Sequence, residues 1–180
     1  MKKGFSIDNM KDITLLVGDQ GCGKSSVLEL LSSNQSIDLE LTVLGQKGVD
    51  TRFFDFEKDN PRIKNPELYT EPNGISKGIG YGGALATRFE SHGQVLSDFS
   101  VRGLEVLKNC IVFFDEPESS LSVRNQFKLI TNAKKAVDKK CQLIFATHCI
   151  PLIESQEFVY SMEHLKWMKS IEFLQNQKKE

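Results

Sequence analysis

Residues 18–25 read Gly-Asp-Gln-Gly-Cys-Gly-Lys-Ser and match the phosphate-binding pattern GxxxxGK[ST] at every fixed position. Glycines in such a loop let backbone N–H groups converge on phosphate oxygens with no side chain in the way, and a following helix N-terminus adds partial positive charge. We expect Lys24 to reach the β- and γ-phosphates of a nucleoside triphosphate, and the Ser25 hydroxyl to bind Mg²⁺. The residues expected to contact the nucleotide are Gly18, Asp19, Gln20, Gly21, Cys22, Gly23, Lys24, Ser25 and Ser26. A glycine-rich turn with a chance lysine is the alternative.

Two acidic residues follow a second apolar segment. Residues 110–114 are wholly apolar and end in Asp115 and Glu116. We expect Asp115 to be the carboxylate on the Mg²⁺ side, opposite Ser25, and Glu116 to orient or deprotonate a water that attacks the γ-phosphate. A charged boundary between a strand and a turn is the alternative for this pair.

A third strand end, Thr147-His148, completes the candidate site. The residues preceding it, Gln142–Ala146, form another short apolar run. In an open parallel sheet functional groups gather beyond the carboxyl ends of the strands, so one site can collect all three segments. A lone histidine at a strand end is otherwise most often a packed or surface residue.

Hydrophobic patterning predicts the elements that position these groups. Short apolar runs indicate buried parallel strands, and apolar residues at helical spacing indicate helices between them. The pattern predicts an α/β fold with a mainly parallel central sheet flanked by helices. Strands are predicted at 13–17, 39–44, 51–56, 110–114, 142–146 and 158–160, and helices at 25–31, 95–107, 122–138 and 163–177. In the last helix, Leu165, Met168, Ile171 and Leu174 are expected to face inward.

The segment from residue 57 to residue 83 is irregular. Three of the chain's five prolines lie in it, and a glycine run closes it. Loops of this length inside a domain are uncommon and tend to be functional, so residues 61–83 are a candidate contact surface. Residues 51–56 are predicted to pair with residues 39–44 as a hairpin. The alternating aromatic and charged residues 53–62 suggest a partly exposed edge, with packing of Phe53 and Phe56 in the core as the alternative.

Composition bounds the remaining possibilities. At 180 residues the chain is expected to form a single domain, 1–180, and its net charge of −1 gives no global field to attract nucleic acid or an anionic membrane. Nucleic-acid binding is not supported, because no basic groove with interleaved aromatic residues is visible. The four cysteines include no CxxC pair, which indicates reduced thiols and a cytoplasmic location. No apolar run approaches the roughly 20 residues of a membrane span, so direct membrane insertion is not expected.

The order and the sequences of these motifs resemble those of ATPases of the ATP-binding cassette (ABC) type. Among these, they most resemble the stand-alone, SMC-like soluble group of AAA-family ATPases. Residues 18–25 match the Walker A loop of that family, residues 111–116 with Pro117-Glu118 resemble its Walker B strand, and residues 119–122 resemble its D-loop. His148 falls at the position of its switch histidine. The resemblance implies an ABC-type P-loop NTPase core in which Glu116 and His148 are catalytic and Ser25 and Asp115 hold Mg²⁺.

The family's signature segment is represented by Ser91, His92, Gly93 and Gln94. The resemblance implies that these residues bind the γ-phosphate held by the opposite subunit, so that two protomers enclose two ATP molecules head to tail. His92 stands where the family has its first glycine. Gln46 is a weak candidate for the Q-loop glutamine, and the Pro/Gly segment 61–83 takes the place of the helical subdomain.

The implied function is an ATPase that dimerises around ATP and drives or regulates an unidentified partner protein. A non-hydrolysing, ATP-dependent interaction module is the first alternative, because the signature is degenerate and the Q-loop glutamine is poorly matched. The ATPase subunit of a membrane transporter is the second. It is disfavoured because the surface that grips a membrane partner is reduced.

Overall fold

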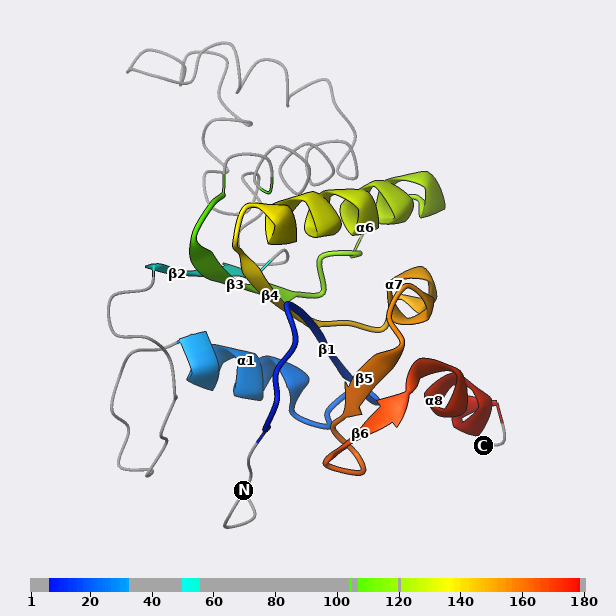
Figure 1. Cartoon of the computed structure of the whole chain (residues 1–180). Coiled ribbons are helices and arrows are strands. Elements are labelled where there is room, and N and C mark those ends of the chain that lie inside the picture. The colour runs from blue at the N-terminus through cyan, green and yellow to red at the C-terminus, as the bar shows by residue number, and fades with distance from the viewer. Residues whose placement is uncertain (1–6, 33–49, 56–103, 105–106, 120, 179–180) are drawn as a thin grey trace, which may run out of the picture.

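The computed structural model describes residues 7–32, 50–55, 104, 107–119 and 121–178. This part of the chain forms a six-stranded sheet of order β2-β3-β4-β1-β5-β6, in which only the β5–β6 pair is antiparallel (Figure 1). The predicted α/β fold with a mainly parallel sheet is therefore confirmed. The elements are β1 Ile13–Val17, α1 Lys24–Ser32, β2 Asp50–Asp55, β3 Cys110–Asp115, α6 Val123–Asp138, β4 Gln142–Ala146, α7 Ile150–Glu154, β5 Phe158–Ser161, β6 Lys166–Lys169 and α8 Ser170–Gln177.

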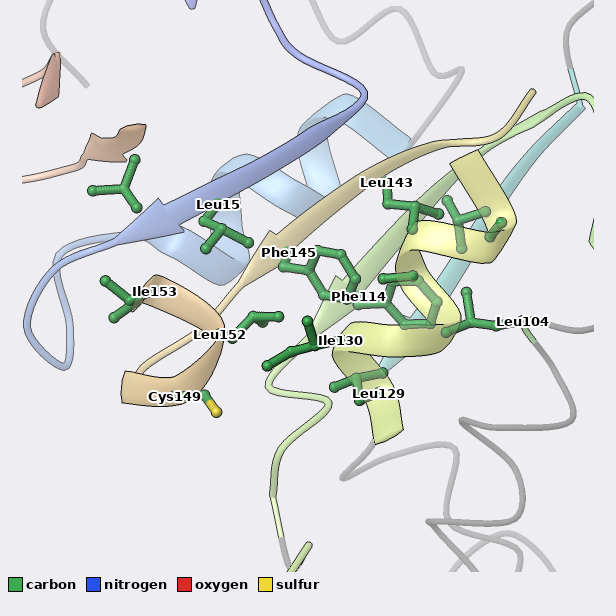
Figure 2. Packing of buried hydrophobic residues seen from close by; sticks show 14 of the residues in the cluster. Leu15, Leu104, Phe114, Leu129, Ile130, Leu143, Phe145, Cys149, Leu152 and Ile153 are labelled. Carbon is green, nitrogen blue, oxygen red and sulfur yellow. The ribbon is translucent and has the colours of Figure 1, made fainter. Parts of the chain in front are cut away.

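The central strands are buried on both faces, which explains their continuous apolar sequences. Alternate side chains of each strand point to opposite faces, so two separate packing clusters form. One face packs against α1 through Leu16, Phe113, Ile144, Val27 and Leu28. The other packs against α6 and α7, as Figure 2 shows, through Leu15, Phe114, Leu143, Phe145, Leu129, Ile130, Leu152 and Ile153. The helices thus cover both faces of the sheet and leave the carboxyl ends of the strands to carry the polar residues.

The edge strand β2 contributes aromatic packing. Phe54 stacks on Phe114 with ring centroids 5.4 Å apart, and Phe114 stacks on Phe145 at 4.9 Å. Phe53, on the opposite face, is partly buried against the α1 side of the sheet. This packing favours the core interpretation for Phe53, whereas Phe56 and residues 39–44, the predicted hairpin partner of β2, lie outside the described residues. Within the described part, β2 pairs in parallel with β3.

The predicted helix over residues 163–177 is wrong in its first half. Leu165 is exposed with a φ of 51°, a left-handed conformation that a helix cannot contain. Residues 166–169 instead form β6, where Met168 is buried on a strand. The Ser161 Oγ and His164 Nδ1 atoms, 3.0 Å apart, close the β5–β6 turn, and this local bond together with the strand pairing outweighs helical periodicity.

The helix at the C-terminus is α8, and its inward face differs from the prediction. Phe173 is buried and Leu174 partly buried, whereas Ile171 is exposed. The short helix α7 was not predicted at all, because five residues with a proline in the first turn carry too little periodicity. Among the described residues, no helix combines the length and apolar character that crossing a bilayer requires.

All four cysteines are free thiols. The sulfur atoms of Cys110 and Cys141 lie 3.7 Å apart in the core. Burial, with the neighbouring Cys141 thiol, raises the pKa of Cys110 to about 11, so little reactive thiolate exists at neutral pH. These two side chains therefore act as small apolar residues in the core.

Two isoleucines provide a matched test of the packing. Ile144 is 2% exposed beneath α1, and Ile171 on α8 is 65% exposed. Ile144→Val is expected to lower the free energy of unfolding by about 0.5–1.5 kcal/mol, because it leaves a methyl-sized gap in a close-packed layer. Ile171→Val is expected to change it by less than about 0.5 kcal/mol. Urea unfolding of the two variants measures the difference, and equal losses would contradict the outward placement of Ile171.

Candidate functional site

The predicted phosphate loop joins β1 to α1, and its glycines occupy conformations that other residues avoid. Gly18 has a φ of 145° and Gly23 a φ of 92°. A side chain at Gly18 would also be strained by contact, since its Cβ would lie 2.9 Å from the Cys22 sulfur. The spacing of glycines in the sequence is thus explained by the backbone path of the loop.

The first turn of α1 presents unpaired backbone donors at the end of this loop. The helix begins at Lys24. Its first hydrogen bond runs from the Val27 N–H to the carbonyl of Gly23 in the loop, at 3.0 Å. The N–H groups before Val27 therefore have no partner within the helix, as at any helix start. Ser25 and Ser26 are exposed there. This end of α1 can bind an anion through its amides, its hydroxyls and the helix dipole.

The Lys24 ammonium lies inside the loop, where the residue is only 5% exposed. Its Nζ donates to the carbonyls of Gly18 and Asp19, each at 3.0 Å, and is 3.8 Å from the Cys22 sulfur. Carbonyls are neutral acceptors, and an anionic phosphate oxygen is a stronger partner for an ammonium group. The lysine is thus held at the loop in a position from which it can bind phosphate.

Ser25 and Asp115 meet across the carboxyl ends of β1 and β3. The Ser25 hydroxyl donates to Asp115 Oδ1 at 3.0 Å. Hard oxygen atoms of this kind suit Mg²⁺, which in nucleotide sites takes one or two protein oxygens and completes its shell with phosphates and water. The described residues contain no cluster of three or more His, Cys, Asp or Glu side chains that could hold a metal alone. The donor set fits a magnesium ion carried in with a nucleotide.

Glu116 and His148 lie side by side at the ends of β3 and β4. Their Oε1 and Nε2 atoms are 3.7 Å apart, and both side chains are exposed. Glu116 has a left-handed backbone with a φ of 46°, which its N–H stabilises by donating to the Ala146 carbonyl at 2.9 Å. Such strained conformations concentrate at functional sites. The pair can act on a group that approaches from solvent.

Two further glutamates contact this site, and sequence reasoning had assigned neither of them a role. Glu118 Oε1 accepts hydrogen bonds from the Thr147 hydroxyl and the His148 N–H, both at 2.7 Å. Burial raises the pKa of Glu118, and these two hydrogen bonds act in the opposite direction. Its position in the Pro117-Glu118 motif is visible in the sequence, but its partners are 29 and 30 residues away.

Glu163 reaches the phosphate loop from the β5–β6 turn. Its Oε1 accepts a hydrogen bond from the Asp19 N–H at 2.6 Å. Gly18 lies beside this contact, since a Cβ there would be 3.5 Å from both Cγ and Oε1 of Glu163, an ordinary van der Waals distance. No signal in the sequence links residues 144 positions apart, so only the fold reveals this contact.

Several predicted residues lie outside the described part of the chain. They are the signature residues Ser91, His92, Gly93 and Gln94, and the Q-loop candidate Gln46. Of the predicted D-loop, Leu121 is buried and Ser122 is the N-cap residue of α6. The structure therefore brings together the loop at 18–25, Asp115, Glu116 and His148, and does not describe the predicted composite half of the site.

Similarity to known proteins is found among solved structures. No family model matches the sequence, and no curated protein matches it. Among solved structures, the chain is similar to a dimeric structure of a post-hydrolysis state of the ATP-binding cassette MJ0796 bound to ADP and Pi, with 14% sequence identity and a TM-score of 0.47. The similarity covers 90% of this chain and 88% of that chain. The chemistry of this chain follows from its own residues.

Proposed function

We propose that this chain is an ABC-type ATPase domain, spanning residues 1–180, that binds and hydrolyses MgATP. The observation that carries the proposal is the 3.0 Å hydrogen bond between Ser25 and Asp115, which joins the end of the phosphate loop to the end of β3. Glu116 and His148 lie next to this junction. A metal-side carboxylate, a phosphate loop and an acid–histidine pair at one sheet edge are the parts that phosphoryl transfer to water requires.

Binding is assigned to the loop and the first turn of α1. Their N–H groups hold the phosphate oxygens, and Lys24 exchanges its loop carbonyls for the β- and γ-phosphates. Ser25 and Asp115 hold Mg²⁺, which supplies positive charge against the phosphate oxygens when bound. ATP is favoured over GTP because no [NT]KxD sequence follows the Walker B strand.

Hydrolysis is assigned to Glu116 with His148. The water oxygen attacks the γ-phosphorus, its proton passes to the Glu116 carboxylate, and the bond between the γ-phosphorus and the bridging oxygen breaks to release ADP. To the His148 imidazole, whose Nε2 lies 3.7 Å from Glu116 Oε1, we assign a hydrogen bond to the γ-phosphate and the orientation of the carboxylate. Both side chains are exposed, so water reaches them freely.

The proposal includes a head-to-tail dimer. Its support is the motif resemblance: Ser91, Gly93 and Gln94 match the segment that completes the site of an opposite subunit in ABC-type ATPases, and His92 replaces a glycine of that segment. Closing and opening of this dimer drives or regulates a partner protein, with residues 61–83 as the proposed contact. The SMC-like soluble group is the subgroup we assign on the same motifs.

Light scattering coupled to size exclusion tests this function on the wild-type protein. We expect MgATP, or a non-hydrolysable analogue with Mg²⁺, to convert monomer to dimer, and phosphate to be released from the MgATP sample. Ser91→Arg is the matched control, since a bulky cation at the signature should block dimerisation and leave binding at residues 18–25 intact. Binding without dimerisation or turnover would instead identify a nucleotide-binding interaction module, and absence of binding would overturn the proposal.

A further inference from the structure

We propose that Glu118 is a positioning residue that fixes His148 beside Glu116. The proposal rests on two short hydrogen bonds accepted by one atom. Glu118 Oε1 receives the Thr147 hydroxyl and the His148 N–H, both at 2.7 Å. Charge-assisted bonds of this length are roughly twice as strong as bonds between neutral groups. One carboxylate from the turn after β3 thereby holds the backbone of the segment after β4.

Thr147 gives the contact a defined direction. The residue is fully buried, and its hydroxyl oxygen accepts the Cys149 N–H at 3.0 Å. The Thr147 hydroxyl is therefore the donor in its hydrogen bond with Glu118, and Glu118 Oε1 is the acceptor. Through Thr147, the carboxylate also fixes the start of α7, because Cys149 is the N-cap residue of that helix.

Glu116 and Glu118 belong to the same rigid turn. The Ser119 N–H donates to the Glu116 carbonyl and the Leu121 N–H donates to the Glu118 carbonyl, each at 2.9 Å. Pro117 between the two glutamates is buried and restricts φ. The same turn thus carries Glu116 and the glutamate that holds the His148 backbone, and the side chains of Glu116 and His148 lie 3.7 Å apart.

A carboxylate at this position is costly for stability alone. Glu118 Oε2 is buried and has no hydrogen-bond partner among the described residues. Desolvating such an atom without a partner costs free energy that an apolar side chain of the same shape avoids. The presence of glutamate here is therefore explained by the two hydrogen bonds that Oε1 accepts from Thr147 and His148.

Among the described residues, the side chain of Glu118 makes hydrogen bonds to Thr147 and His148 and none to the phosphate loop or to the Ser25–Asp115 pair. Its removal should therefore act on the chemical step and spare nucleotide binding. This catalytic consequence rests on the proposed function, whereas the structural link between Glu118 and His148 does not.

The test compares Glu118→Ala with Glu118→Gln, and the control is Glu154→Ala at an exposed position of α7. In nucleotide-free protein, we expect Glu118→Ala to shift the His148 amide proton upfield in the NMR spectrum, because its charge-assisted bond is lost. In turnover assays we expect Glu118→Ala to lower kcat about tenfold or more, because the reacting groups are misplaced. We expect its KM for ATP to stay within about twofold of the wild-type value. Glu118→Gln keeps an oxygen acceptor and should restore kcat to within about threefold.

The outcomes distinguish the structural link between Glu118 and His148 from its proposed effect on catalysis. An unchanged His148 amide in Glu118→Ala overturns the positioning role. So does an equal loss of kcat in the Ala and Gln variants accompanied by an equal fall in Tm, which would mark a purely structural role. If the wild type does not hydrolyse ATP, the proposed function fails and the amide shift still decides the role of Glu118. If the Ala variant does not fold, Glu118→Asp, which withdraws the carboxylate by one methylene, should give the same amide shift.

Discussion

Replacing Glu116 by Gln is expected to lower kcat for ATP hydrolysis by about 10²–10⁴-fold, the usual contribution of a positioned general base. The amide keeps the size of the side chain and its place 3.7 Å from His148, but it cannot take the proton of the attacking water. Asp115, Ser25 and the loop are unchanged, so MgATP should bind as in the wild type. Phosphate release at saturating MgATP, with nucleotide affinity by calorimetry, measures both quantities.

Glu154→Gln is the matched control for this substitution, because Glu154 is an exposed glutamate of α7. It should leave kcat and affinity unchanged. If dimerisation follows ATP binding, Glu116→Gln should accumulate as an ATP-bound dimer where the wild type returns to monomer. Wild-type turnover in the Glu116 variant would remove this residue from the mechanism and move the search for the base to other groups near His148.

The core of the site could be predicted because its signals are local. The positive φ angles at positions 18 and 23 favour glycine, so the glycines in the sequence indicate the backbone path of the loop. The strands β3 and β4 are recognisable by their runs of apolar residues, which follow from the helices that cover both of their faces. A parallel sheet then brings the ends of β1, β3 and β4 to one edge, and the meeting of Ser25 with Asp115 follows from that geometry.

Contacts that depend on tertiary structure could not be predicted. Glu118 meets the end of β4 and Glu163 meets the phosphate loop only after the strands are in place. Around residue 165, apolar spacing favours a helix, but the Ser161–His164 bond and pairing with β5 form a hairpin. The spacing of apolar residues indicates only that one face of a segment is buried. Over four residues, a strand and one turn of a helix fit this spacing equally well.

Replacing Lys24 by Met is expected to weaken ATP binding by about 2–5 kcal/mol, or roughly 30- to 4000-fold, the cost of removing one partner of a buried charge pair. Lys24 is only 5% exposed, and its ammonium group is held by the loop carbonyls at the position where phosphate is expected. Methionine has nearly the same length and is apolar, so it fills the space and removes the charge. Calorimetric titration with MgATP measures the change in Kd.

The control is Lys134→Met on α6, an exposed lysine that should change neither affinity nor stability. Lys24→Met also leaves the Gly18 and Asp19 carbonyls without their donor, so part of its effect could come from a distorted loop. Lys24→Arg separates the two causes: it keeps the charge and the hydrogen bonds to carbonyls, but its planar group does not fit the point-like position of the ammonium. If Met and Arg both abolish binding with an unchanged Tm, the loss belongs to the phosphate contact. Normal affinity in Lys24→Met would show that phosphate is not bound at this loop.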